Sequence, residues 1–337
     1  MKLYKFYAVL ILLLMFSCSK EKMTDNEVVN INPNARVVGY LPEYRFNTSN
    51  QLEYCKLTHL NLAFANPDSS GKLIINDFSH ILTKARNQNS EIKIYISIGG
   101  GSLSELQSSI WSDLIDNYEN RSIIIKEIVD FVTKNDLDGV DVDLEWGNVT
   151  SGYSPFVIGL KESLTSHKKG MTAALPGTTR FKNITDEAIQ NFDFINIMAY
   201  DFTGPWNPTN SGQHSSYNNS VQSIEFWTNS VGISGTKLTL GVPFYGYDFT
   251  DSSNITSFTY GSIVSAQSTN SELDNVGMKF YNGRPTIKSK VKLASEKVSG
   301  IMIWELGQDS FSEFSLLKTI HNQYKDLGYN TTSLCLD

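Results

Sequence analysis

Three carboxylates at alternate positions mark the segment best suited to chemistry. Residues 138–146 read DGVDVDLEW, so single apolar residues separate Asp141, Asp143 and Glu145. In a β-strand the three acids would share one face, because successive side chains alternate across a strand. Like charges roughly 7 Å apart and partly buried are unfavourable, so we expect at least one acid to keep its proton. A carboxyl group that keeps its proton is a candidate general acid.

Two other interpretations compete with catalysis. The acids could form the solvated face of an edge strand, but the residues between them are all apolar, which indicates that the other face is buried. They could bind Ca²⁺, but an EF-hand loop that starts at Asp141 needs glycine where Trp146 stands. The 3 Cys and 5 His form no CxxC and no HExxH pattern, so we expect no metal and no cofactor.

The elements that would position these acids repeat along the chain. Short runs rich in β-branched and aromatic residues recur along the chain and are predicted to be strands. Segments with helical periodicity lie between most of these runs. Strands that alternate with helices are expected to pair in parallel. Eight such units predict an α/β fold of the (β/α)₈ barrel type, with the site at the carboxyl ends of the strands. A doubly wound sheet is the alternative, but no GxGxxG follows the first run. The predicted strands are 36–41, 59–65, 93–100, 139–146, 171–177, 194–200, 237–246 and 300–306, and the predicted helices are 78–87, 121–135, 185–192, 220–230, 286–297 and 312–325.

The composition limits the partners. The 337 residues are 40% hydrophobic and 19% charged, which is typical of a globular protein. Asp and Glu number 35 against 28 Lys and Arg, giving a net charge of −7, which argues against binding to nucleic acid. No second domain is recognisable between residues 36 and 330, and we expect a monomer.

The N-terminus is predicted to direct export. Residues 1–17 have the pattern of a signal peptide, with an apolar run at 6–16 that is shorter than the ~20 residues of a membrane-spanning helix. Cys18 follows at once and resembles the lipidated cysteine of bacterial lipoproteins; the alternative is an ordinary secretory signal. Residues 18–35 are polar and suit a tether. We therefore expect a protein anchored by lipid to the cell envelope, with the barrel at 36–330 and a short tail at 331–337.

DGVDVDLE matches the DGxDxDxE signature of glycoside hydrolase family 18, the chitinases and related endo-β-N-acetylglucosaminidases. Further segments resemble the family's other strand motifs and occur in the family's order. They are SIGG at 97–100, MAYD at 198–201, GVPFYG at 241–246 and GIMIW at 300–304. The resemblance covers about residues 36–325 and implies the barrel fold and hydrolysis of glycans that contain N-acetylglucosamine.

The resemblance also implies a mechanism. Glu145 would be the general acid, and the substrate's own 2-acetamido oxygen, not a second carboxylate, would attack the anomeric carbon. Asp143 would bind the acetamido N–H and stabilise the developing positive charge. Asp141 would share a proton with Asp143. Tyr200 would donate its hydroxyl to the acetamido oxygen, and the product would keep its anomeric configuration.

A second set of residues would contact the substrate, although Phe64, Ser97, Gly100 and Trp146 could equally have a structural role. Non-proline cis peptides are implied at Ala63–Phe64 and Trp304–Glu305, and the histidines receive no role. The implied contact residues are Tyr40, Phe64, Ser97, Gly100, Trp146, Met198, Asp201 and Trp304.

Three functions remain open. The favoured one is an endo-acting, chitinase-type hydrolase of β-1,4-linked N-acetylglucosamine chains. The second is an endo-β-N-acetylglucosaminidase acting on the chitobiose core of N-glycans, and the third is a non-catalytic glycan-binding lipoprotein, which the retained Glu145 disfavours. Residues 247–299 are too few for a full chitinase insertion domain, so a shallow cleft is expected.

The remaining two cysteines are predicted to pair. Cys55 precedes the second strand and Cys335 follows the last helix. A closed barrel brings its first and eighth helical regions together, so a Cys55–Cys335 disulfide is a geometric hypothesis.

Overall fold

The computed structural model describes residues 35–329. The predicted signal peptide, Cys18, the tether to residue 34 and Cys335 therefore lie outside the described residues. Among the described residues, no helix combines the length and the apolarity needed to cross a bilayer.

Eight parallel strands form a closed barrel. The barrel closes because β1 pairs with β13 on one side and with β2 on the other, and the short β3 (Leu73–Ile74) extends β2 in the antiparallel direction. The predicted (β/α)₈ fold is thus confirmed, with every predicted strand present. The barrel strands are β1 (Arg36–Pro42), β2 (His59–Pro67), β4 (Lys93–Gly99), β5 (Gly139–Asp143), β6 (Gly170–Pro176), β7 (Phe194–Met198), β8 (Leu238–Pro243) and β13 (Gly300–Trp304).

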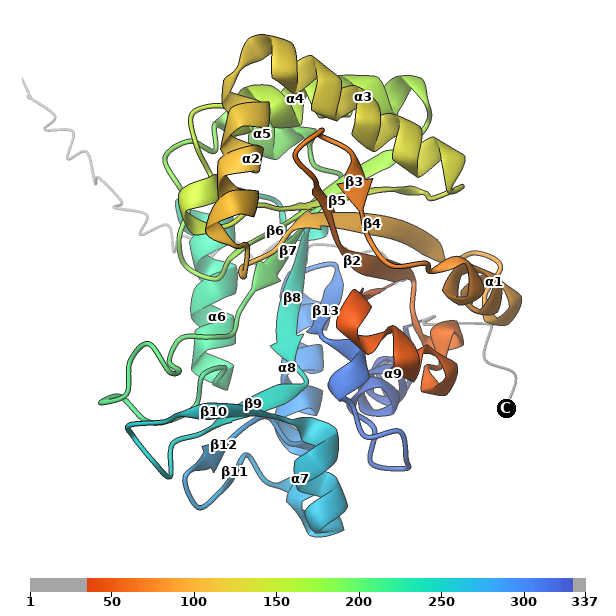
Figure 1. Ribbon diagram of the computed structural model, residues 1–337. Coiled ribbons are helices and arrows are strands. Elements are labelled where there is room, and N and C mark those ends of the chain that lie inside the picture. Colours follow the sequence, from red (N-terminus) through yellow and green to blue (C-terminus); the bar gives the residue numbers. More distant parts are fainter. Residues whose placement is uncertain (1–34, 330–337) are drawn as a thin grey trace, which may run out of the picture. The chain divides into compact units, whose positions relative to one another are not determined.

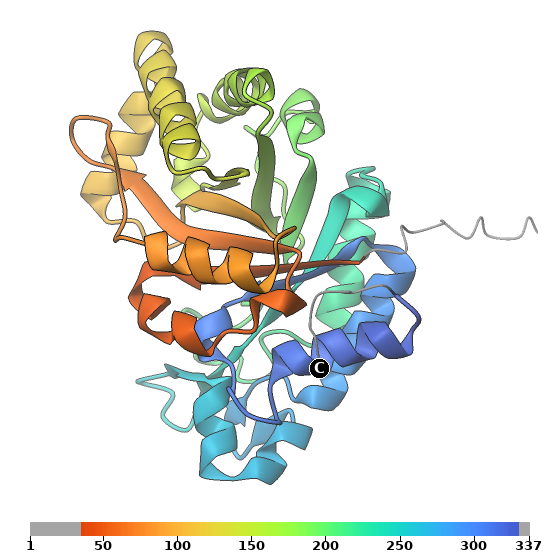
Figure 2. The same ribbon diagram turned by 90° about the vertical axis from the view of Figure 1, so that its right-hand side faces the viewer.

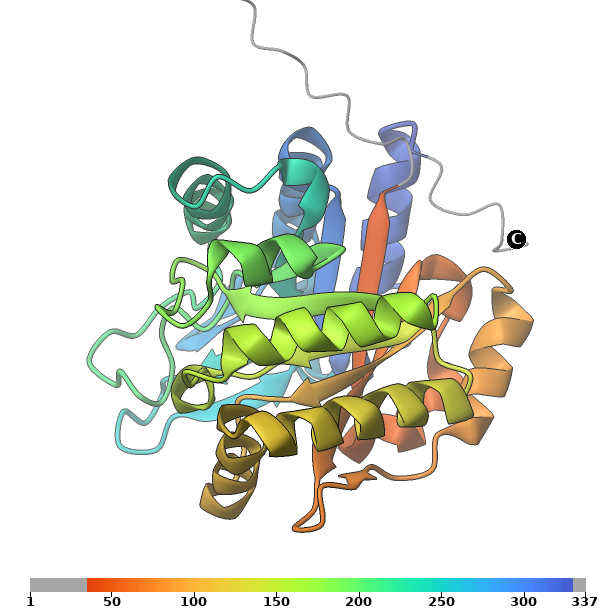
Figure 3. The same ribbon diagram turned by 90° about the horizontal axis from the view of Figure 1, so that it is seen from above.

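Helices surround the strands (Figures 1 and 3), and all six predicted ones are present. Of the described helices around the barrel, α2 and α4 were not predicted; α4 contains Pro155 and Gly159, which weaken a helical pattern. Figure 2 shows α8 and α9, in blue, lying side by side. The helices are α1 (Ser79–Gln88), α2 (Glu105–Asp116), α3 (Tyr118–Lys134), α4 (Tyr153–Ser166), α5 (Asp186–Asn191), α6 (Tyr217–Glu225), α8 (Arg284–Lys297) and α9 (Leu316–Asp326).

Short turns complete the connections. The position after β1 holds two 3₁₀ turns instead of an α-helix, and α6 continues into a π-type turn. The turns are η1 (Glu43–Gln51), η2 (Tyr54–Lys56), η3 (Trp146–Asn148), η4 (Phe226–Ser230), η5 (Gly235–Lys237) and η7 (Leu306–Gln308).

A small insertion follows β8 and forms a separate lobe in Figure 1. Its four-stranded antiparallel sheet has the order β10-β9-β12-β11, with α7 beside it. Sequence analysis predicted no separate strands here, because all four are only two to four residues long. The elements are β9 (Tyr245–Asp248), β10 (Thr256–Thr259), α7 (Tyr260–Ala266), η6 (Ser268–Glu272), β11 (Asn275–Val276) and β12 (Lys279–Phe280).

The region of Cys55 lies next to α9, as the closed barrel predicted. Glu53 before η2 pairs with Lys318 of α9, with Oε2 and Nζ 3.7 Å apart. Cys55 itself is disulfide-bonded. Because Cys335 lies outside the described residues, its pairing with Cys55 stays a prediction.

Candidate active site

Side chains of β5 and the two residues after it alternate between two faces, as the sequence predicted. Val140, Val142 and Leu144 are buried in the main apolar core, between the barrel and its helices. Asp141 and Asp143 are also buried, with 0% and 3% of their surface exposed. Unlike the apolar side chains, these two acids face residues inside the barrel. The strand therefore presents an acidic face inward and an apolar face outward.

Asp141 is held by four hydrogen-bond donors. Its Oδ2 accepts from the hydroxyls of Tyr40 at 2.7 Å and Ser97 at 2.8 Å. Its Oδ1 accepts from the Thr172 hydroxyl at 2.6 Å and the Asn196 amide at 3.3 Å. Burial raises the pKa of Asp141, and these four donors oppose that rise. A carboxyl group that only accepts hydrogen bonds is best satisfied when ionised, so Asp141 is the charged member of the row.

Strand register places these donors at one height. Ser97 of β4 and Thr172 of β6 are the register neighbours of Asp141 on either side. Asn196 of β7 is oriented by the Thr239 hydroxyl of β8, which donates to its Oδ1 at 2.7 Å. Tyr40 and Ser97 were implied as substrate contacts; in the structure both are buried and donate to Asp141. Thr172, Asn196 and Thr239 were missed, although polar residues on the inward face of apolar strands were a usable signal.

Asp143 lies in a different environment. Its Oδ1 is buried and has no hydrogen-bond partner among the described residues. Burial, followed by the charges of Glu145 and Asp141, holds the pKa of Asp143 well above its usual value. The resemblance implied a proton shared between Asp141 and Asp143; because Asp141 already accepts four bonds, the proton of this pair belongs on Asp143.

Glu145 follows the end of β5 and is partly exposed. Burial raises its pKa to about 7, with the charge of Asp201 as the second cause. The side chain fits beside Gly101, where a Cβ would stand 2.7 Å from Glu145 Oε1. A carboxyl that holds its proton close to neutral pH can act as a general acid.

The SIGG segment lets two backbones approach closely. The N–H of Gly100 donates to the carbonyl of Asp143 at 2.7 Å. A Cβ on Gly99 would lie 2.5 Å from the same carbonyl oxygen, and one on Gly100 would lie 2.8 Å from the Phe64 ring. Both glycines have positive φ, 101° and 97°. Gly100 therefore makes room for Phe64 in this structure.

An aromatic cluster adjoins the acids. The Trp304 indole stacks on Phe64, with ring centroids 5.6 Å apart and planes at 28°, and it meets the edge of Tyr40 at 5.7 Å. The peptides Ala63–Phe64 and Trp304–Glu305 are both cis, as the resemblance implied. Half-buried rings of this kind offer an apolar face on which a sugar can lie.

The MAYD segment at 198–201 forms a second side of the candidate active site. The Tyr200 hydroxyl lies 3.8 Å from Met302 Sδ, and burial raises the pKa of Tyr200 well above its usual value, so it remains a donor. Met198 is half-buried against the interior cluster that includes Tyr40 and Met302. The Tyr200 ring meets the edge of Tyr245 from the insertion at 6.3 Å.

Asp201 is held by residues that sequence analysis missed. Its Oδ1 accepts from the hydroxyl of Tyr245 at 2.5 Å and from that of Tyr247 at 3.1 Å. His214 Nδ1 lies 3.1 Å from the same oxygen. The GVPFYG motif included Tyr245, but nothing in the sequence linked it to Asp201, because the contact depends on how the insertion folds back.

Two tryptophans lie on the rim. Trp146 is 63% exposed and meets the edge of Phe181 at 6.1 Å. Trp206 is 59% exposed and meets the edge of Tyr247 at 5.8 Å. Exposure at this level leaves both indoles able to contact an extended ligand.

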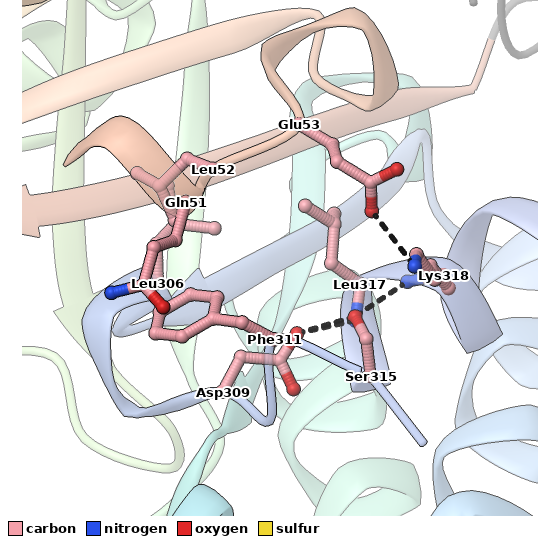
Figure 4. Close-up of a pocket in the computed structure, with 9 residues that line it drawn as sticks. All are labelled: Gln51, Leu52, Glu53, Leu306, Asp309, Phe311, Ser315, Leu317 and Lys318. Carbon is pink, nitrogen blue, oxygen red and sulfur yellow. Dashed lines mark hydrogen bonds and ion pairs between the residues drawn. The ribbon is translucent and has the colours of Figure 1, made fainter. Parts of the chain in front are cut away.

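A pocket of about 240 Å³ lies away from these groups, where the η1–η2 segment meets the start of α9 (Figure 4). It contains none of the predicted site residues. Within residues 35–329, no cluster of three or more His, Cys, Asp or Glu could hold a metal ion. The pocket is lined by Gln51, Leu52, Glu53, Leu306, Asp309, Phe311, Ser315, Leu317 and Lys318.

Comparison with known proteins supports this description. Residues 36–309 match the family model described as Glycosyl hydrolases family 18. The fold resembles the crystal structure of the GH18 chitinase ChiB from the chitin utilization locus of Flavobacterium johnsoniae, with a TM-score of 0.86 and 53% identity over 87% of this chain and 95% of that one. A chitinase from Bacteroides thetaiotaomicron gives a TM-score of 0.75 and 28% identity over 88% and 98% of the two chains.

A curated relative is more distant. The chitinase-like effector of Moniliophthora roreri is 27% identical over 229 residues, which are 59% of this chain and 55% of that protein. The match thus spans about half the length of this curated relative.

Proposed function

The chain belongs to glycosyl hydrolase family 18, and from this premise we propose that it is a retaining, endo-acting hydrolase of β-1,4-linked N-acetylglucosamine oligosaccharides. Two features of the site support the proposal. Glu145 has a pKa of about 7 and sits at the open end of the acidic row. The neighbouring carboxyl group, Asp143, is poised to receive a donor from a ligand.

The unpartnered oxygen of Asp143 carries the proposal. A buried carboxyl oxygen without a partner is unfavourable, so a ligand that brings an N–H to it gains affinity. The acetamido group of N-acetylglucosamine offers such an N–H next to the anomeric carbon. A sugar with a free 2-hydroxyl presents a different geometry and carries no acyl oxygen.

The proposed reaction uses the substrate's own nucleophile. Glu145 gives its proton to the leaving glycosidic oxygen while the acetamido oxygen attacks the anomeric carbon, forming an oxazolinium ion. Asp143 accepts the acetamido N–H, and this hydrogen bond strengthens as the acetamido group becomes positively charged, which stabilises the oxazolinium ion. Water activated by the now ionised Glu145 then opens the ring from the opposite side, so the two inversions give retention.

The surrounding residues would orient this reaction. Tyr200 would donate to the acetamido oxygen and set its angle of attack. Trp304 and Phe64 would lie beneath the reacting sugar. Trp146 and Trp206 would contact more distant sugars, because their indoles are exposed on the rim.

Chitin-type chains are preferred over N-glycans as the substrate. Two solved relatives, from Flavobacterium johnsoniae at 53% identity and from Bacteroides thetaiotaomicron at 28% identity, are chitinases. The insertion places the hydroxyls of Tyr245 and Tyr247 beside Asp201, and the exposed indoles of Trp146 and Trp206 would suit contacts with an extended linear chain.

A comparison of two substrates tests the proposal. Wild-type protein is incubated with chitotetraose and with a high-mannose N-glycan, and the anomer of the first product is read by NMR. We expect cleavage of chitotetraose to a β-anomer and no cleavage of the N-glycan. Glu145→Gln should lower kcat by at least ~10²–10⁴-fold while chitotetraose still binds. An α-anomer, or full activity in Glu145→Gln, would refute the mechanism; cleavage of the N-glycan alone would select the endo-β-N-acetylglucosaminidase.

We also propose that the protein is exported and anchored through a lipid on Cys18. The support is the short apolar run that precedes this cysteine. Cys18→Ala should move the protein from the membrane fraction to the soluble fraction. Unchanged fractionation would contradict the anchor.

A further inference from the structure

The insertion after β8 contributes a face of aromatic residues to the candidate active site. Tyr245, Tyr247 and Phe249 stand at alternate positions along β9 and the residue after it, so their rings share one face. They belong to a hydrophobic cluster that is separate from the main core. Tyr200 and Trp304, both proposed to contact the reacting sugar, pack against this cluster.

Tyr247 contacts two different parts of the site. The residue is buried, with 7% of its surface exposed. Its hydroxyl donates to Asp201 Oδ1 at 3.1 Å, and the Tyr245 hydroxyl donates to the same oxygen at 2.5 Å. The Tyr247 ring and the Trp206 indole meet edge to face, with centroids 5.8 Å apart and planes at 88°. One side chain thus links Asp201 to an indole on the rim.

The two tyrosine hydroxyls leave the other oxygen of Asp201 available. Both donate to Oδ1, and within residues 35–329 Oδ2 receives no hydrogen bond. The Asp201 side chain is 38% exposed, and it directly follows Tyr200 in the chain. A carboxyl oxygen in this position can accept a hydrogen bond from a sugar hydroxyl. Because Oδ1 is held by the insertion, the direction of Oδ2 depends on Tyr245 and Tyr247.

The Trp206 indole is held by two neighbours. A Cβ on Gly204 would lie 2.6 Å from the ring atom Cη2, so the missing side chain at Gly204 makes room for the indole. Tyr247 provides the second contact. Trp206 is nevertheless 59% exposed. An indole that is supported and exposed offers an apolar platform to the C–H face of a sugar.

We propose that Tyr247 is a positioning residue that joins binding of the reacting sugar to binding of a more distant sugar. Its hydroxyl orients Asp201, and its ring supports the Trp206 platform. The arrangement fits a chain of N-acetylglucosamine units long enough to contact Asp201 and Trp206 together. The inference rests on the function proposed above for the nature of this ligand, and it gives the insertion a role in selecting ligand length.

The test uses dissociation constants measured by calorimetry in the Glu145→Gln background, which lacks the proposed acid. Chitobiose is the short ligand and chitohexaose is the long one. Tyr247→Phe removes only the hydroxyl, so both ligands should bind roughly two- to tenfold more weakly, with their ratio unchanged. Trp206→Ala removes only the platform and should weaken chitohexaose alone, by at least about fivefold. Tyr247→Leu should show both losses.

Double variants measure the support that the ring gives to the indole. In the Tyr247→Phe background, Trp206→Ala should still cause its full loss of chitohexaose affinity, because the ring remains. In the Tyr247→Leu background, Trp206→Ala should add less than about twofold, because the platform has already lost its support. Equal losses in the two backgrounds, or a changed ratio of the two ligands in Tyr247→Phe, would overturn the proposal.

Tyr281→Phe is the matched control. Tyr281 is fully buried in the same insertion, and its hydroxyl donates to the Asn270 carbonyl at 2.7 Å. Removal of that hydroxyl should change neither dissociation constant. A loss as large as that of Tyr247→Phe would show that any weakening of the insertion impairs binding, and would overturn the specific role of Tyr247.

Gly204→Ala covers the case in which Tyr247→Leu does not fold. Its Cβ would displace the Trp206 indole from Tyr247, so this variant should weaken chitohexaose alone. Unchanged chitohexaose binding in Gly204→Ala, or no binding of chitohexaose to Glu145→Gln itself, would overturn the inference. A protein that binds with the expected pattern but cleaves neither ligand as wild type would refute the proposed function and leave this inference standing.

Discussion

At the residue scale, neighbours give three similar acids three different states. Four donors keep Asp141 ionised, although it is fully buried. Asp143, two residues on, has a buried oxygen with no donor and therefore keeps a proton. Glu145 lies at the rim with a pKa of about 7, between these extremes. Chemical type alone does not separate these roles, because two of the acids are identical side chains.

The raised pKa of Glu145 predicts the pH dependence of the enzyme. The acid must be protonated to work, and its pKa lies above the ordinary value. We therefore expect kcat/KM on chitotetraose to be retained through mildly acidic pH and to fall tenfold per unit above about pH 7. A profile measured from pH 4 to 9 checks this. A limb near the ordinary glutamate value of about 4.3 would contradict it.

Tyr200 is predicted to act mainly in the transition state. Its bond to the acetamido oxygen should strengthen as that oxygen attacks, so Tyr200→Phe should lower kcat by about tenfold or more with little change in KM. Tyr118→Phe is the control, because that ring is 79% exposed on α3. A rise in KM at constant kcat would indicate that Tyr200 only binds the substrate.

At the element scale, the end of β4 must pass close to the end of β5. Gly99→Ala places a Cβ 2.5 Å from the Asp143 carbonyl oxygen at a φ of 101°, and a backbone atom cannot move aside cheaply. We expect a loss of roughly 1–3 kcal/mol in the free energy of unfolding, measured in urea. Gly147→Ala is the matched control: no atom lies within 4 Å of its Cβ, so its effect should stay within about 0.5 kcal/mol. Equal stability of the two variants would contradict the tight contact.

Lys290 connects helix α8 to the loop that contains His214 and Ser215. Its Nζ donates to Ser215 O, Ser215 Oγ and Asn282 Oδ1, each at 2.7 Å. Lys290→Met leaves Ser215 Oγ and Asn282 Oδ1 without this donor, although the Ser215 carbonyl still accepts from Asn282 Nδ2, and it should lower the free energy of unfolding at pH 9 by about 1–3 kcal/mol. Lys292→Met is the control, because Lys292 is exposed on the same helix.

The effect of Lys290 should depend on pH with a definite sign. Burial lowers its pKa to about 7 in the folded state, whereas an unfolded lysine titrates near 10.4. Between these values the unfolded chain binds more protons, so this group's contribution to stability rises with pH and is lost as pH falls to about 7. The difference between wild type and Lys290→Met should therefore widen from pH 7 to pH 9. A difference that narrows would contradict the lowered pKa.

At the scale of the whole molecule, a disulfide is predicted to join the two ends of the barrel. Cys55 is bonded, and Glu53 beside it contacts α9. A Cys55–Cys335 bond would close a loop around nearly the whole barrel and add a few kcal/mol to the free energy of unfolding. Non-reducing peptide mapping should recover the linked pair, and Cys335→Ser should abolish the effect of reductant on the melting temperature. A bond from Cys55 to Cys18 would refute both this pairing and the lipid anchor.

Local sequence was enough for the strands, most helices and the acid row. Alternation in DGVDVDLE dictates which side chains share a face, since neighbouring residues in a strand must point to opposite sides. The same short-range logic located the SIGG and MAYD strand ends. It failed for α4, whose proline and glycine weaken the pattern, and for the short strands of the insertion, which are held by pairing with one another.

Tertiary structure alone determined the state of each acid. Ser97 and Thr172 reach Asp141 because strand register sets three distant segments at one height, and no local pattern encodes that register. His214 and Asp201 meet because a long loop returns to the strand end. Sequence thus determines which groups are available and which way a strand presents them. Barrel closure determines which donors surround each carboxylate, and hence which acid is charged and which holds a proton.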